Sequence, residues 1–357
     1  MSDERGSCPS ASGIGRLELC PGSWNLEQQF PEVESADATE GTIRHELIAD
    51  DEVIVDSLDP ERRFVVERSR SLTEKARSEC GFKGESTIRK EERYWLLNEA
   101  GARVLSGKFD YAEYEKKTGL VIDYKTLGGY QVNAYDNLQL RAYAVLLAEK
   151  HGLDCVYICL IQPLGIQAYS MDMLGKKDLK EAKKNILDIL RSALSPNAQR
   201  RPHPNACKWC KALVHCPEVR NVMDTIIEVD LEKLEEPYEI ERLVGVAQIA
   251  SKWADRLTKW VKAKLVEDDA FLPNYRLRKT GSVKSIKDMP KAIKLISEGL
   301  GLKEGDLKKY LKVTLADLTK LYEEKTGDKK GSRKAVEGML AEVIVAKEKS
   351  PSLQKAK

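Results

Sequence analysis

The chain has 357 residues and a formal net charge of +2, a length that suits one large or two ordinary domains. Its 42% hydrophobic and 32% charged residues are typical of a globular protein with helix-rich parts, and the sequence has neither a membrane-spanning apolar run nor a signal-peptide core, so we expect a cytoplasmic protein. Eight cysteines in such a chain favour free thiols or a metal centre over a disulfide framework.

Helices are predicted along most of the N-terminal part. Cys20 ends the first helix, because the proline that follows it cannot continue a helix. His45 lies in the second helix, for which Thr42 is the expected N-cap. A single helical histidine is more often packed or exposed than a metal ligand, so His45 by itself predicts no site. The helices are expected over residues 14–20, 38–50 and 61–80.

Strands are predicted next. Residues 86–97 resemble one strand, and Glu91 within it would lie close to the following hairpin if the two are neighbours. The hairpin has a first arm at about residues 104–114 and a second arm at residues 120–125, separated by a polar turn that ends in glycine. The charges around Glu91 fit an exposed surface equally well.

The hairpin carries a candidate metal site. On a strand, side chains two apart share a face, so Asp123 and Lys125 project together and Tyr124 points the other way. Asp110 on the first arm would lie across from Asp123, and two carboxylates with an amine suit a divalent cation and an activated water. Ordinary solvated charges on an edge hairpin are the alternative, against which the apolar run of residues 120–122 argues.

A strong helix is predicted over residues 133–149, where Gln139 and Tyr143 are four residues apart and share one face. A half-buried amphipathic helix in which Tyr143 simply packs is the alternative. Cys155 and Cys159 are expected to be small core residues of the buried strand that follows. Beyond the helix we predict strands over residues 155–163 and 167–173 and an amphipathic helix over 178–194.

A cysteine-rich segment follows. Three cysteines in a C-x2-C-x5-C pattern, with prolines before and after, predict a metal knuckle. Three thiolates need a fourth ligand, for which Cys20, His203 and His215 are the candidates, and a histidine would indicate zinc. The three cysteines are Cys207, Cys210 and Cys216.

The C-terminal part is helical and basic. A long helix is predicted over residues 237–269 and a basic hairpin over 274–286, and the last twenty or so residues are expected to fray. Residues 273–357 contain 21 Lys+Arg and 11 Asp+Glu, a charge of +10 against −8 for the remainder. A polyanionic partner and a solvated lysine-rich helical surface explain this asymmetry equally well.

Taken together, these residues resemble the RecB-like branch of the PD-(D/E)XK nuclease superfamily, and particularly its iron–sulfur members, which include the CRISPR-associated adaptation nuclease and the nuclease domain of AddB. The similarity covers roughly residues 8–220, and the motifs occur in the family's order. They are the histidine motif at His45, G-x-x-D at 107–110, D-x-K at 123–125, Q-x-x-x-Y at 139–143, and one cysteine before the core (Cys20) with three after it (Cys207, Cys210, Cys216).

The resemblance implies an α/β fold with a PD-(D/E)XK restriction-endonuclease-like core, in which helices flank a mixed central sheet. Residues 1–225 would form this nuclease domain, closed by an iron–sulfur clasp, and residues 226–357 a mainly helical basic region. The rest of the chain, with its lysine-rich tail, resembles a phage-encoded relative.

For the site, the resemblance implies that His45, Asp110, Asp123 and the Tyr124 carbonyl bind Mg²⁺ or Mn²⁺, with the nitrogen ligand favouring Mn²⁺. Lys125 would orient the attacking water, and whether it also accepts the proton stays open, because an ordinary lysine has a pKa of about 10.4. Gln139 and Tyr143 would contact the DNA backbone or support the ligands from behind. The four cysteines would hold a structural [4Fe-4S] cluster, with Zn²⁺ as the alternative.

The implied activity is that of a metal-dependent DNA exonuclease, acting on ends or single strands in recombination or DNA-end processing. Its partners would be DNA and either other recombination proteins or a second copy of the chain, with no membrane involved. A non-catalytic DNA-binding recombination scaffold, with a structural zinc or iron–sulfur knuckle, is the alternative function.

Overall fold

The computed structural model describes two compact units. By their contacts, Met1–Asp56 and Glu61–Leu257 form the first unit, and Ser57–Pro60 and Thr258–Lys357 the second. The domain boundary expected between residues 225 and 226 stays a prediction. The residues described are 8–30, 36–82, 85–127, 132–227, 236–278, 282–286, 289–301, 315–327, 331–341, 343–348 and 352–355. Every helix within these ranges is too short or too polar to serve as a transmembrane span.

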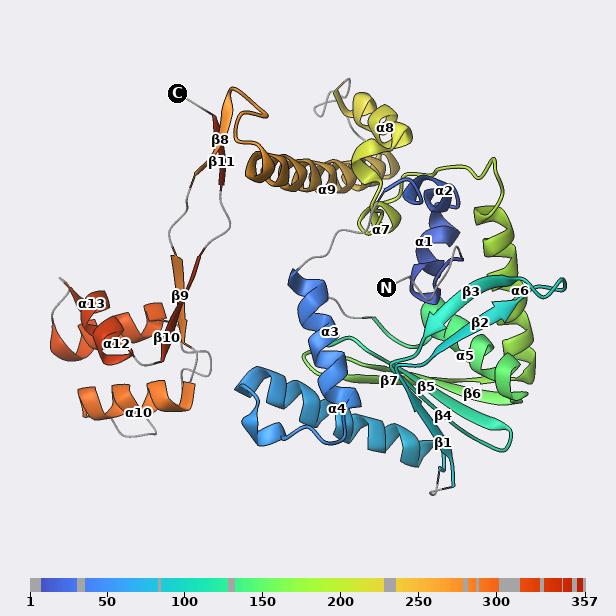
Figure 1. Cartoon of the computed structure of the whole chain (residues 1–357), viewed down its shortest axis with the longest axis horizontal. Coiled ribbons are helices and arrows are strands. Elements are labelled where there is room, and N and C mark those ends of the chain that lie inside the picture. The colour runs from blue at the N-terminus through green and yellow to red at the C-terminus, as the bar shows by residue number, and fades with distance from the viewer. Residues whose placement is uncertain are drawn as a thin grey trace. The chain divides into compact units, whose positions relative to one another are not determined.

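The first unit is built on a mixed five-stranded sheet (Figure 1). Strands β5 and β6 run parallel, because a helix carries the chain back between them, and the other neighbouring pairs are antiparallel. The order across the sheet is β1, β4, β5, β6, β7, which makes β5 the central strand. The strands are β1 (Thr87–Lys90), β4 (Tyr111–Glu115), β5 (Thr118–Tyr124), β6 (Cys155–Ile161) and β7 (Tyr169–Gly175).

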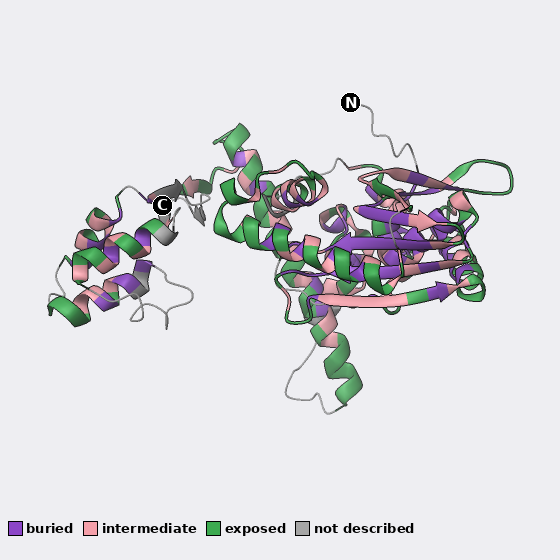
Figure 2. Cartoon of the chain, turned by 90° about the horizontal axis from the view of Figure 1, so that it is seen from below, coloured by how far each residue is buried: buried purple, intermediate pink, exposed green. Residues whose placement is uncertain are grey.

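Helices cover both faces of this sheet (Figure 1). Helices α5 (Leu138–His151) and α6 (Lys176–Ala193) pack on one face, and α4 (Pro60–Glu79) on the other. Strand β5 is buried on both sides, which explains its continuous apolar run. Figure 2 shows the inner strands largely buried, whereas the edge strands β1 and β7 are mostly of intermediate burial. The predictions of a mixed central sheet flanked by helices, of the strand at 155–163 and of the helix at 178–194 are confirmed.

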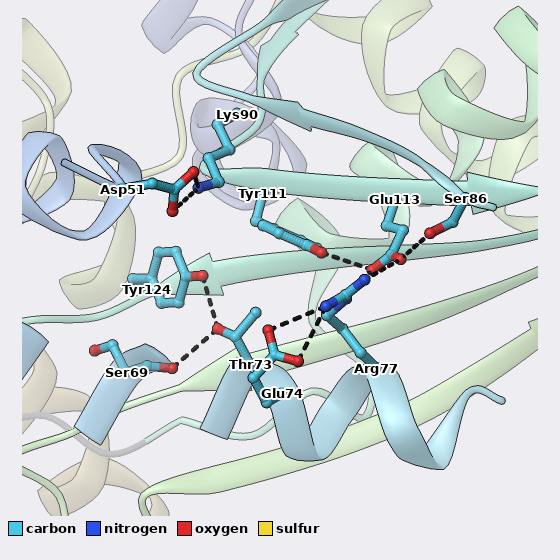
Figure 3. Close-up of polar contacts among 10 residues, drawn as sticks. All are labelled: Asp51, Ser69, Thr73, Glu74, Arg77, Ser86, Lys90, Tyr111, Glu113 and Tyr124. Atoms are coloured by element: carbon cyan, nitrogen blue, oxygen red, sulfur yellow. Dashed lines mark hydrogen bonds and ion pairs between the residues drawn. The ribbon is translucent and has the colours of Figure 1, made fainter. Parts of the chain in front are cut away.

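A buried ion-pair network holds α4 to the sheet (Figure 3). The Glu113 side chain has no exposed surface and accepts two hydrogen bonds from Arg77, at 2.8 and 3.0 Å, and one from the Tyr111 hydroxyl at 2.6 Å. Ser86 makes a further short contact with the same carboxylate. Burial acts to raise the pKa of Glu113, but these hydrogen bonds outweigh it and lower the pKa. The buried negative charge of Glu113 is therefore paired with the positive charge of Arg77 and hydrogen-bonded, as a buried charge requires.

The predicted hairpin is wrong in its first arm. The arm consists of two strands in different sheets, β3 (Arg103–Lys108) and β4, and only β4 pairs with β5. The predicted strand at 86–97 is likewise two strands, β1 and β2 (Arg93–Leu97), and β2 pairs with β3 in a separate two-stranded sheet. The chain therefore passes between the sheets twice, at residues 91–92 and 109–110.

Two predicted helix starts are also wrong. Helix α3 (Ala36–Ala49) begins six residues before Thr42, which is therefore an interior residue and not the N-cap. Helix α5 begins at Leu138 and not at residue 133, because Asp136 has a φ of 57°, which a helix does not allow, and the Asn137 side chain accepts a hydrogen bond from the Leu140 amide as the N-cap.

The two ends of the first unit lie together (Figure 1). The Ser106 amide donates a 2.9 Å hydrogen bond to the Pro9 carbonyl, so the N-terminal segment joins β3.

The predicted helices at 14–20, 61–80 and 237–269 are confirmed. The remaining elements of this region are η1 (Ala11–Gly13), α1 (Ile14–Leu19), α2 (Ser23–Glu27), η2 (Val55–Ser57), α7 (Pro204–Cys207), η3 (Leu213–His215), α8 (Pro217–Ile227) and α9 (Pro237–Glu267).

The second unit has its own small core, formed by apolar side chains of three helices. The basic hairpin predicted at 274–286 is wrong: β8 (Tyr275–Arg278) and β9 (Ser282–Ile286) do not pair with each other but with β11 (Ser352–Lys355) and β10 (Ile344–Glu348). These partners lie in the segment that we expected to fray. The helices are α10 (Met289–Leu300), α12 (Leu315–Thr326) and α13 (Ser332–Met339), in accord with the predicted helical C-terminal region.

Candidate metal centre

The carboxyl end of β5 carries two candidate site residues on one face. The Asp123 side chain is only 4% exposed, and its Oδ2 lies 2.7 Å from the Lys125 ammonium. Tyr124 points to the opposite face, where its hydroxyl lies 2.8 Å from the Thr73 hydroxyl of α4 (Figure 3). The predicted alternation of these three side chains along the strand is therefore confirmed.

Asp110 and His45 reach this strand end from two other elements. Asp110 Oδ2 accepts a 2.8 Å hydrogen bond from the Tyr124 amide, and its Oδ1 lies 3.1 Å from Nδ1 of His45 on α3. The register of β4 and β5, with residue 111 opposite residue 122, brings Asp110 beside Asp123. Side chains from α3, from the residues just before β4 and from the end of β5 thus lie close together.

A third carboxylate, Glu91, lies in the same place. One ligand atom from each of His45, Glu91 and Asp110 lies within 4.8 Å of the others, the only such group of three or more His, Cys, Asp or Glu in the described part of the chain. Asp123 is paired with Lys125 and is not in this group. The sequence placed Glu91 near the hairpin but gave no reason to count it among the ligands.

Gln139 and Tyr143 lie behind the carboxylates. Gln139 Nε2 donates hydrogen bonds to Asp123 Oδ1 at 2.8 Å and to the Tyr143 hydroxyl at 3.1 Å, and Gln139 Oε1 accepts one from Lys125 at 3.3 Å. Tyr143 is 5% exposed. Of the two roles expected for this pair, these contacts favour support of the ligands, and a contact with DNA stays a prediction.

Gly107 explains how β3 and α5 come so close. A Cβ at this position would lie 2.5 Å from the Leu146 Cδ1, a distance that real Cβ atoms essentially never show, and 3.0 Å from the Tyr143 ring, which is tighter than most real Cβ contacts. The glycine of the G-x-x-D sequence therefore makes room for the tyrosine of the Q-x-x-x-Y sequence. The two sequences are linked by packing as well as by the site.

Burial and neighbouring charges shift three pKa values in the site. Burial raises the pKa of Asp123, and Asp110 adds to this while Lys125 opposes it. Burial acts to lower the pKa of His45 and of Lys125, but the adjacent carboxylates outweigh it, so both pKa values are raised. The crowded carboxylates thus favour a nearby positive charge, which a divalent cation would supply.

Arg44, the residue before His45, fixes α3 against the strand end. Its buried guanidinium donates a 2.7 Å hydrogen bond to the Thr126 carbonyl, just after β5. It also donates to Glu40 at 2.8 Å and to Glu61 at 2.7 Å. The helix that carries His45 is therefore tied to the strand that carries Asp123.

The four candidate cluster ligands line one cavity. Neither candidate histidine is among the lining residues: His203 Nδ1 accepts a hydrogen bond from the Asn205 amide at 3.2 Å, and His215 stacks on Phe30 with ring centroids 4.4 Å apart. Of the three candidates for the fourth ligand, the cysteine is the one that shares the cavity. The thiols lining it are those of Cys20, Cys207, Cys210 and Cys216.

Cys20, Cys207 and Cys210 are buried, and Cys216 is partly exposed. Burial raises the pKa of all four, to about 11 for Cys207 and about 12 for Cys210. Among the described residues, no three of these sulfurs lie within 4.8 Å of one another. Tetrahedral zinc, with Zn–S bonds of about 2.3 Å, would bring its thiolates to about 3.8 Å from one another.

Part-buried polar contacts attach neighbouring helices to the cysteine segment. The Glu27 carboxylate of α2 accepts a 2.8 Å hydrogen bond from the Lys211 amide and pairs with Arg16 at 2.7 Å. Arg256 of α9 donates to the carbonyls of Lys208, at 2.9 Å, and of Cys210. Helix α2, which precedes the cysteine segment in the sequence, and helix α9, which follows it, are therefore both hydrogen-bonded to that segment.

Comparison with known proteins gives a matching family and weak likenesses to solved structures. The model of a family described as "Protein of unknown function (DUF2800)" matches residues 7–356. No curated protein matches the sequence. The solved structure titled "Crystal structure of SSO0001" aligns at 15% identity and a TM-score of 0.36, over 60% of this chain and 88% of that one. A likeness at this level does not establish a shared fold.

Proposed function

The chain belongs to the DUF2800 family, and because that description names no activity, we propose from the site that the protein is a divalent-metal-dependent deoxyribonuclease of the RecB-like PD-(D/E)XK type. The supporting observation is the meeting of His45, Asp110, Asp123 and Lys125 at the end of the central strand. We propose exonuclease action on DNA ends or single strands, in recombination or end processing.

The donor set fits a divalent cation. Imidazole nitrogen and carboxylate oxygens converge beside a buried aspartate, and their mutual repulsion would be relieved by a cation. His45, Asp110 and Asp123 would hold it, with the carbonyl of Tyr124 as the further proposed ligand. A site that includes an imidazole nitrogen is expected to bind Mn²⁺ more strongly than Mg²⁺.

When bound, the cation would supply Lewis acidity to water and to the scissile phosphate. Lys125, whose pKa is raised, stays protonated and can donate to a phosphate oxygen as negative charge develops there. Gln139 holds both Lys125 and Asp123 in place. In the hydrolysis, a bond forms between a water oxygen and phosphorus, and this water loses a proton to solvent. The bond from phosphorus to the leaving sugar oxygen breaks, and solvent supplies the proton that this oxygen takes up.

We propose that the cysteine cavity holds a structural [4Fe-4S] cluster. Four cysteines, three of them buried, line one cavity, and no three of their sulfurs lie as close together as a single tetrahedral zinc requires. Because their pKa values are raised, binding would displace protons and gain strength with pH. Its role would be to bind the N-terminal helix to the segment after residue 200.

Digestion of end-labelled DNA tests the nuclease proposal. Single- and double-stranded substrates labelled at the 5′ or 3′ end are incubated with the full chain and Mn²⁺ or Mg²⁺. We expect metal-dependent shortening, with a loss of roughly 10²–10³-fold or more in Asp123→Asn and Lys125→Met. Lys117→Met, at the turn between β4 and β5, is the matched control and should retain activity.

Digestion that survives both site substitutions would overturn the assignment. Metal-dependent DNA binding without any cleavage, by a protein with intact folding, would instead identify the recombination scaffold.

A further inference from the structure

Glu91 occupies the point where the chain leaves the main sheet. It follows β1 and precedes β2, and its φ is 53°, a value that residues other than glycine rarely adopt. The neighbouring Glu92 carbonyl accepts a 2.9 Å hydrogen bond from the Phe109 amide, next to Asp110. The backbone on both sides of Glu91 is therefore fixed beside the candidate metal centre.

The two carboxylate oxygens of Glu91 have different surroundings. Oε2 forms an ion pair with Lys108, which belongs to β3. Oε1 is buried and accepts no hydrogen bond from any described residue. Burying a carboxylate oxygen without a partner is costly, so a further donor or a cation at Oε1 would be favourable.

Two side chains of the kind that bind metal ions, His45 and Asp110, lie near Glu91. One ligand atom each of Glu91, His45 and Asp110 lies within 4.8 Å of the others. Glu91 is also one of the charges that raise the pKa of His45. A nitrogen and two carboxylate oxygens at this spacing can bind one divalent cation together.

We propose that Glu91 is a ligand of the divalent cation, alongside His45 and Asp110. This inference rests on the proposed function, because it concerns the same cation. It adds a carboxylate from outside the four sequence motifs and makes the site richer in oxygen. The donor set then spans the turn between β1 and β2 as well as α3 and the strand ends.

Direct measurement of Mn²⁺ binding tests this assignment without relying on cleavage. The full chain is freed of divalent cations and titrated with Mn²⁺ alone, while electron paramagnetic resonance follows the free ion. We expect Glu91→Gln to weaken binding roughly 10- to 100-fold. Glu92→Gln is the matched control, because Glu92 is adjacent, 44% exposed and paired with Arg89, and its affinity should equal that of the unmodified chain.

A second variant guards against a folding defect. Glycine adopts the φ of 53° at position 91 without strain, so Glu91→Gly should fold and should also bind Mn²⁺ weakly. If the unmodified chain binds Mn²⁺ and both variants bind it equally well, Glu91 is not a ligand, and the proposed nuclease is unaffected. If the unmodified chain itself binds no Mn²⁺, the proposed function fails first.

Discussion

Gln139 donates a 2.8 Å hydrogen bond from Nε2 to Asp123 Oδ1, so one side chain of α5 sets the orientation of the buried carboxylate on β5. The same amide accepts from Lys125 through its oxygen. Because the amide has a donor end and an acceptor end, it matches the carboxylate and the ammonium simultaneously. Gln139 is therefore a positioning residue for both.

Replacing Gln139 by alanine should lower kcat for DNA hydrolysis and Mn²⁺ affinity, each by roughly 10- to 100-fold, since Asp123 and Lys125 lose their common support. Steady-state kinetics and Mn²⁺ titration measure the two effects. Lys150→Ala, an exposed position on the same helix, should change neither. Unchanged Mn²⁺ affinity in Gln139→Ala would contradict the positioning role.

Gly107→Ala should destabilise the first unit by about 1–3 kcal/mol, because the added methyl group would overlap Leu146 and the Tyr143 ring. Urea unfolding measures this loss. Gly15→Ala is the matched control: a Cβ there meets nothing within 4 Å, and alanine is the better helix former by about 0.5–1 kcal/mol. Equal stability of Gly107→Ala and the unmodified chain would show that β3 and α5 can separate.

Cys20→Ser should lose iron and stability together. Protein purified without oxygen should be brown and should contain about four iron atoms per chain, the number in one [4Fe-4S] cluster. In Cys20→Ser the iron content should fall sharply and thermal unfolding should occur at a lower temperature. Cys155→Ser, whose side chain does not line the cavity, should keep its iron. A colourless protein with one zinc per chain would refute the cluster.

Stability should fall in acid partly because of Glu40. Hydrogen bonds from Arg62 and Arg44 lower the pKa of Glu40 from 4.5 to about 2. A depressed carboxyl pKa stabilises the fold above pH 4.5, and this contribution is lost as the pH falls through about 2. Since Glu40 is 28% exposed, we expect roughly 1–2 kcal/mol after solvent screening.

Unfolding measured from pH 6 to pH 2 should therefore show a shallower acid loss in Glu40→Gln than in the unmodified chain. The exposed Glu46 of the same helix provides the control, through Glu46→Gln. Parallel pH profiles for Glu40→Gln and the unmodified chain would mean that the Arg62 and Arg44 contacts do not persist in solution.

Local patterns were sufficient for the regular elements. The strand of residues 155–161 and the helix of residues 176–193 have continuous or periodic apolar residues with clear ends. Strand alternation likewise placed Asp123 and Lys125 on one face, opposite Tyr124. These features depend on backbone geometry within a few residues, which a sequence records directly.

Changes of sheet and long-range pairings were not predictable in the same way. Nothing in the sequence marks Glu91, rather than Glu92, as the residue with positive φ, because glycine is the usual signal for such a turn. The chain therefore looked like one long strand where it forms β1 and β2. The pairing of β8 with β11 joins residues more than seventy positions apart, and strand patterns carry no information about partners at that distance.

The closure of the first unit has a consequence for its synthesis. Cys20 accepts a 3.2 Å hydrogen bond from the Arg201 amide, and a Cβ at Gly22 would lie 2.5 Å from the Ala198 carbonyl oxygen. The N-terminal segment also contacts β3 and α5, but its docking is complete only after about two hundred residues have left the ribosome. We expect the emerging chain to complete this docking late in folding, and the proposed cluster to be bound only after that.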